Sequence, residues 1–160
     1  MEILKTKSKP FNSLKMKKII ITLAVALSTL CSFAGEVKVN SRVLDAFKSE
    51  FASAKEVNWT AGSNFYKAAF VYNDQYVFAF YSTAGEFLGM TRYISSLDLP
   101  MSLQNGLKKG YCNYWISDLF EVSNNDGTAY YITLEDADSK IVLKSDGAAT
   151  WSVYQKTTKS

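Results

Sequence analysis

The first regular pattern of hydrophobic positions in the chain has the period of a helix. Val43, Phe47 and Phe51 stand at i, i+4 and i+8, so they form one apolar stripe. Ser41 is the expected N-cap, because its hydroxyl can accept a hydrogen bond from a free amide of the first turn. We expect this helix to end near residue 53 and the alternating segment KEVNW to begin a strand.

The pattern then changes to runs of about eight residues rich in aromatic residues and valine, which are typical of strands. Stretches of turn-forming residues separate these runs at 61–64, 73–75 and 82–85. The first half of the chain therefore reads as one helix followed by four antiparallel strands.

The second half repeats this order of elements. Leu103, Leu107 and Tyr111 again stand at i, i+4 and i+8, and Pro100 precedes them where a helix can start. Strand-like segments follow, separated by NNDG, DADS and SDG. We predict an α+β fold made of a tandem α-β-β-β-β repeat, with units at about 41–95 and 98–156 that share one sheet or core.

The N-terminus has the pattern of a secretory signal peptide. Lysines are concentrated before residue 19, the uncharged and mostly apolar run 19–33 follows, and Ser32 and Ala34 suit the positions before a cleavage site. A membrane anchor needs about 20 apolar residues, so this run is short for one. We expect cleavage after Ala34, with Met16 as a possible true start. A periplasmic or secreted domain 35–160 without a membrane span would remain.

The two cysteines have different expected roles. Cys31 would have to follow a small residue to be a lipoprotein site, and Leu30 before it is bulky, so lipidation is disfavoured. Cys112 is then alone in the mature part, which excludes an intramolecular disulfide. We expect Cys112 to be a small buried apolar side chain rather than a reactive thiol.

Removal of the leader changes the charge of the protein. The chain has 18 basic and 15 acidic residues, and the leader holds six of the former and one of the latter. The mature part is therefore slightly acidic, and the sequence predicts no nucleic-acid partner.

The sequence contains no residues that suggest catalysis or a cofactor. Histidine is absent, which removes the commonest general base and metal ligand. A Gly-rich phosphate loop, a nucleophile elbow and a zinc-binding cysteine pair are absent as well. The acidic group Glu135, Asp136 and Asp138 is expected to be a solvated turn, with weak calcium binding as the alternative. We predict no enzyme, no cofactor, no metal site and no catalytic residue.

The segments VNW, YKAAFVYNDQYVFAFYSTAGEFL and ISDLFEVSNNDGTAYYITLEDADSKIVLKSDGAATW resemble the PepSY-like family of exported bacterial proteins, common in the Bacteroidetes. That family is similar in fold to the beta-lactamase inhibitor protein, and the resemblance covers roughly 41–156. It implies helices on one side of a curved antiparallel sheet whose open face could hold a partner. It brings no catalytic residue, and most members have no assigned activity.

Alternation within the strands assigns side chains to the two faces of the sheet. In the first half, Lys67 marks the outer face. The expected core set is Tyr66, Phe70, Tyr72, Tyr76, Phe78 and Phe80. The expected outer set is nearly uncharged and is our candidate partner-binding face: Lys67, Ala69, Val71, Val77, Ala79 and Tyr81.

In the second half, one face is apolar and the other mainly polar. The apolar set is Tyr130, Ile132, Leu134, Ile141 and Leu143, and the opposite set is Tyr131, Thr133, Glu135, Lys140, Val142 and Lys144. The apolar outer face of the first half should therefore be covered by the rest of the chain, by a second copy or by a ligand.

We predict a non-catalytic exported protein that binds an unknown protein or peptide through this sheet face. The alternative is a structural or homodimeric envelope protein. A small-ligand or carbohydrate binder is a third possibility, although Trp59, Trp115 and Trp151 are expected in the core or at edges.

Overall fold

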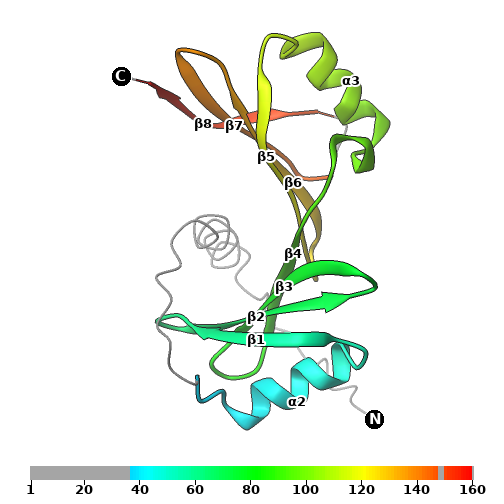
Figure 1. Cartoon of the computed structure of the whole chain (residues 1–160), viewed down its shortest axis with the longest axis vertical. Coiled ribbons are helices and arrows are strands. Elements are labelled where there is room, and N and C mark those ends of the chain that lie inside the picture. The colour runs from blue at the N-terminus through cyan, green and yellow to red at the C-terminus, as the bar shows by residue number, and fades with distance from the viewer. Residues whose placement is uncertain (1–36, 148–149, 160) are drawn as a thin grey trace, which may run out of the picture. The chain divides into compact units, whose positions relative to one another are not determined.

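The computed structural model describes residues 37–147 and 150–159. The predicted leader 1–34, with Met16, Cys31 and the cleavage site at Ala34, lies outside these residues. Figure 1 shows the described elements in chain order. They are α2 (Ser41–Glu50), β1 (Lys55–Ala61), β2 (Phe65–Tyr72), β3 (Gln75–Ser82), β4 (Phe87–Tyr93), the 3-10 helix η1 (Ser96–Asp98), α3 (Met101–Gly110), β5 (Trp115–Asn124), β6 (Gly127–Glu135), β7 (Ser139–Ser145) and β8 (Ser152–Thr158).

The elements form a tandem α-β-β-β-β repeat, which confirms the predicted fold class. The strands make one curved antiparallel sheet in the order β1 to β8. The two repeats meet where β4 pairs with β5, with Met90–Tyr93 opposite Phe120–Ser123. The halves therefore share a sheet, as their small size requires.

The helices begin and end close to the predicted positions. Asn40, and not Ser41, is the N-cap of α2, because its side chain accepts a hydrogen bond from the amide of Arg42 at 3.0 Å. The helix ends at Glu50, three residues earlier than expected, and the amide of Phe51 donates to the carbonyl of Phe47. Pro100 stands at the N-cap of α3, as predicted.

The turn between β2 and β3 overturns the predicted faces of β3. Asn73 and Asp74 form a two-residue turn with φ of 50° and 60°, which is the positive-φ geometry of tight hairpins. Residues directly opposite each other share a face, and this turn places even positions of β2 opposite odd positions of β3. Phe70 is thus opposite Val77, and Tyr66 is opposite Tyr81.

The predicted faces of β3 were therefore exchanged. Tyr76, Phe78 and Phe80 point away from the helices, while Val77, Ala79 and Tyr81 point toward them. Side-chain bulk favours Tyr76, Phe78 and Phe80 as the core set, but the two-residue turn fixes the register and places them on the opposite face. The face assignment within β2 was correct.

Both helices pack on one face of the sheet, which we call the helix-covered face. Beneath α2, the ring of Phe47 contacts those of Trp59 and Phe70 at 5.2 and 4.9 Å. Beneath α3, Leu103 packs in a cluster with the predicted apolar set of the second half. This cluster includes Leu119, Ile132, Leu134, Ile141 and Leu143.

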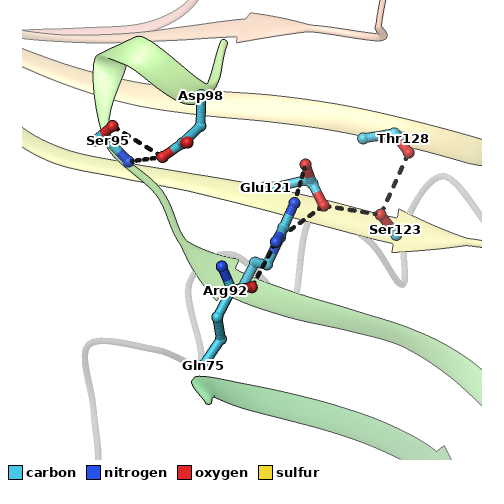
Figure 2. A network of polar contacts seen from close by, with 7 residues as sticks. All are labelled: Gln75, Arg92, Ser95, Asp98, Glu121, Ser123 and Thr128. Carbon is cyan, nitrogen blue, oxygen red and sulfur yellow. Dashed lines mark hydrogen bonds and ion pairs between the residues drawn. The ribbon is translucent and has the colours of Figure 1, made fainter. Parts of the chain in front are cut away.

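A polar network occupies the helix-covered face where the repeats meet (Figure 2). Arg92 on β4 is directly opposite Glu121 on β5, and its Nε and Nη2 donate to the two carboxylate oxygens at 3.1 and 3.3 Å. Arg92 Nη1 also donates to Gln75 Oε1 on β3 at 2.5 Å. This two-point geometry is the strong form of an Arg–carboxylate pair. The network thus links three strands across the junction.

The strand side chains that point away from α2 and α3 form the opposite surface, which we call the helix-free face. The register carries this face through every strand from β1 to β8. It includes Lys67, Ala69 and Val71 of β2 and the predicted polar set of the second half. The prediction for the second half was therefore correct.

We expect Phe47→Ala to lower the free energy of unfolding by about 3–5 kcal/mol, because the truncation leaves a cavity between α2 and the sheet. Phe47 is 5% exposed, whereas Leu97 is 82% exposed. Leu97→Ala is the control, with an expected change within about 0.5 kcal/mol. Urea unfolding followed by circular dichroism measures both. Equal losses for the two variants would contradict this description of the core.

Candidate functional site

The structure does not bring the six predicted site residues together. Lys67, Ala69 and Val71 lie on the helix-free face. The other three, Val77, Ala79 and Tyr81, belong to the core under α2 and are at most 2% exposed. These three are therefore removed from the candidate surface.

Aromatic side chains from both repeats gather on the helix-free face instead. The turn length between β2 and β3 would have placed those of β3 there from the sequence alone. The set is Phe65, Tyr76, Phe78, Phe80, Tyr93, Phe120, Tyr131 and Tyr154.

These rings contact one another across the sheet. Phe78 of β3 lies 5.2 Å from Tyr76 and 6.3 Å from Tyr93 of β4, measured between ring centroids. Tyr93 is directly opposite Phe120, which stacks on Tyr131 of β6 at 5.3 Å. Such pairs stabilise one another beyond simple burial. The aromatic side chains therefore form a row that crosses the junction between the repeats.

Exposure differs along this row. Tyr76 and Tyr93 are 52% and 53% exposed, while Phe80 and Tyr131 are at most 1% exposed. Large aromatic rings that remain half-exposed are a common feature of protein interfaces.

Lys67 is a buried cation on the same face. The residue is 3% exposed, and its Nζ lies 5.2 Å from the centroid of the Phe78 ring. Burial lowers the pKa of the Lys67 ammonium below its ordinary value. Within the described residues, Nζ has no hydrogen bond and no ion pair. The ring contact replaces only part of the hydration that the cation has lost.

The second half has two lysines in its predicted outer set, and both of them have acidic neighbours. Lys140 Nζ lies 3.6 Å from a Glu135 oxygen, and Lys144 Nζ lies 2.5 Å from an Asp146 oxygen. Lys67 therefore differs from them in burial and in lacking a carboxylate.

Two hydroxyl groups on the helix-free face are buried and have no hydrogen-bond partner within residues 37–147 and 150–159. They are Thr91 Oγ1 and the phenol oxygen of Tyr131. Such groups are uncommon, because a buried hydroxyl that has lost water and gained no partner costs about 1–3 kcal/mol. The buried Tyr81 on the other face is different, since its hydroxyl donates to Glu50 Oε2 at 3.1 Å.

The acidic turn at 135–138 serves the fold. Asp136 Oδ1 accepts hydrogen bonds from the amides of Asp138 and Ser139 at 2.9 and 2.6 Å. Although desolvation opposes the shift, these donors hold the pKa of Asp136 below its ordinary value. Glu135 pairs with Lys140 and with Lys159 at 2.8 Å. Across residues 37–147 and 150–159, no group of three or more His, Cys, Asp or Glu residues could hold a metal ion.

Cys112 is exposed, so its predicted burial was wrong. It lies beyond Tyr111, the C-cap of α3, and so outside the apolar stripe of the helix. The thiol borders a cavity of about 260 Å³ whose lining includes Leu107, Ile116 and Leu134. Among the helices that the structure describes, none has the length and apolar character to cross a membrane.

Comparison with known proteins shows the fold alone. No family model matches this chain, and no curated protein matches it. A BLIP-like protein from Bacteroides fragilis superposes with a TM-score of 0.67 at 16% identity, covering 78% of this chain and 89% of that one. A DUF2874 family protein from Bacteroides ovatus gives 0.69 at 17%, covering 77% and 89%. A Bacteroides eggerthii protein, provisionally described as periplasmic, gives 0.67 at 13%, covering 76% and 90%.

The two buried tyrosines give a matched test of the helix-free face. We expect Tyr131→Phe to leave the free energy of unfolding unchanged or to raise it by up to about 1 kcal/mol, because it removes an unpaired hydroxyl. Tyr81→Phe should lower it by about 1 kcal/mol, because it removes the hydrogen bond to Glu50. Urea unfolding at neutral pH measures the free energy of unfolding of both variants. A loss in Tyr131→Phe as large as that in Tyr81→Phe would show that the Tyr131 hydroxyl has a partner.

The burial of Tyr131 should also make the stability of the protein depend on pH in the alkaline range. Burial, with smaller effects of Tyr154 and Asp146, raises its pKa to about 12 from the ordinary 10.0. The folded state thus favours the neutral phenol, and this contribution is complete below pH 10 and lost as the pH rises through 12. We expect the stability of the wild type relative to Tyr131→Phe to fall between about pH 10 and pH 12. A difference that stays constant over this range would contradict the raised pKa.

Proposed function

We propose that this chain is an exported, non-catalytic binding protein of the PepSY-like type, which recognises another protein or a peptide with its helix-free face. The row of aromatic side chains across that face carries the proposal. Interfaces are enriched in aromatic residues, because a tyrosine supplies a large contact area at a low entropic cost. No described helix packs over the row, although both helices cover the opposite face.

The arrangement of the polar groups also agrees with a non-catalytic role outside the cytoplasm. The buried polar groups of the helix-free face are dispersed over separate strands and do not converge on one reacting centre. Several carboxylates have local partners, such as Arg92 for Glu121 and Lys159 for Glu135. The leader-like N-terminus and the periplasmic description of one structural neighbour support action outside the cytoplasm.

We expect Tyr93→Glu to reduce binding through this face by about tenfold, because a charge would replace a half-exposed ring in the aromatic row. The probe is a set of peptides selected by display on the wild-type protein from random peptides. Their affinities are then measured by fluorescence anisotropy. Leu97→Glu is the control, because Leu97 is exposed in η1 and outside the face.

The outcomes separate the possible functions. Peptides that bind Tyr93→Glu as tightly as the wild type would contradict the proposal, provided that both variants unfold at the same urea concentration. Light scattering tests the alternative of self-association. A stable wild-type dimer that Tyr93→Glu dissociates would show that a second copy covers the face, and would contradict an external partner.

A further inference from the structure

Three hydrogen-bond donors on the helix-free face have no acceptor among the described residues. They are the ammonium of Lys67 on β2, the hydroxyl of Thr91 on β4 and the hydroxyl of Tyr131 on β6. Each of these residues is at most 3% exposed. The two hydroxyls are closed to water and have no partner among the described residues. The Lys67 side chain is largely buried and has no ion pair or hydrogen bond within the same residues, which is a costly arrangement for a charged group.

The three donors belong to one surface. Lys67 Nζ lies over the ring of Phe78, and Phe78 is directly opposite Thr91. Tyr131 is opposite Phe120, which is opposite Tyr93 on the strand of Thr91. The donors therefore alternate with aromatic rings across five adjacent strands. At about 4.8 Å between strands this distance is roughly 19 Å, which about six residues of extended chain can span.

The charge of these groups defines the missing ligand. An ammonium requires an anion, and a buried ion without its counter-ion is strongly disfavoured. On strands β3 to β6, the acidic residues of this face are Asp118 on β5 and Glu135 on β6, and strands β3 and β4 lie between them and Lys67. A carboxylate at Lys67 would therefore meet a local positive charge.

We propose that the helix-free face recognises an acidic, extended segment of a partner protein. One carboxylate of the segment binds the Lys67 ammonium, and its carbonyl or side-chain oxygens accept from Thr91 and Tyr131. The rings between the donors pack against the remainder of the segment. This inference rests on the proposed function and adds to it the chemistry of the partner.

The test uses random peptides of about twelve residues, long enough to cross the roughly 19 Å between Lys67 and Tyr131. The peptides selected on the wild-type protein are divided into two sets, according to whether the Tyr93→Glu substitution weakens their binding. We expect the weakened set to be enriched in Asp and Glu. Replacing the key acid by its amide should lower affinity for the wild type by about tenfold.

Lys67→Met identifies the residue responsible. It keeps the length of the side chain and removes the charge, so the acid and amide peptides should bind it equally. The unliganded variant should unfold at the same urea concentration as the wild type or at a higher one, because a buried charge has been removed. Lys140→Met is the control, because Lys140 already has Glu135 as a partner. It should keep the tenfold preference.

The results distinguish the two proposals. Peptides that map to the face but show no preference for acids, or that keep their preference in Lys67→Met, would overturn this inference and leave the proposed function standing. If every selected peptide binds Tyr93→Glu as tightly as the wild type, both proposals are overturned. If Lys67→Met fails to fold, the variants Thr91→Val and Tyr131→Phe test the inference instead. Each should weaken the selected peptides without lowering stability, and unchanged affinity in both would overturn the inference.

Discussion

The pairing of β4 with β5 is the interaction on which the rest of this structure depends. Each repeat alone has four strands and one short helix, which is a small unit for an independent core. The four register pairs from Met90 to Tyr93 merge the two into one sheet. Arg92 and Glu121, directly opposite each other, add a charge-assisted pair at this junction. Because the strands continue in register, both helices cover the same face and the other face runs uninterrupted through both repeats.

The two faces of the sheet have different energetic roles. On the helix-covered face, aromatic and aliphatic side chains pack under α2 and α3, and the buried Tyr81 hydroxyl has the Glu50 carboxylate as its acceptor. On the helix-free face, aromatic rings lie beside buried donors for which the described part of the chain supplies no acceptor. Polar groups of this kind lower the stability of the free protein, and a matching ligand recovers the lost interaction. This contrast is the physical basis for the proposal that the helix-free face binds a partner.

Turn length explains both the success and the main error of the sequence-based prediction. The apolar stripes of the two helices, the alternation in β6 and β7 and the turn positions all depend on residues close in sequence, and these predictions were confirmed. The faces of β3 were also locally determined, since a two-residue turn at Asn73–Asp74 fixes the parity of the hairpin. The error came from ranking the two sets by bulk, which does not distinguish a core from an aromatic outer surface.

The amino-acid sequence determined by itself the tandem α-β-β-β-β order, because periodicity and turn chemistry are local properties of the chain. Only the tertiary structure decided that Lys67 is buried, that Cys112 is exposed, and that Lys67, Thr91 and Tyr131 find no polar partner among the residues described. The burial of a group and its hydrogen bonds depend on side chains from strands that are far apart in the sequence. A pattern of residues shows which groups need partners, and only the packed sheet shows which of them remain without one.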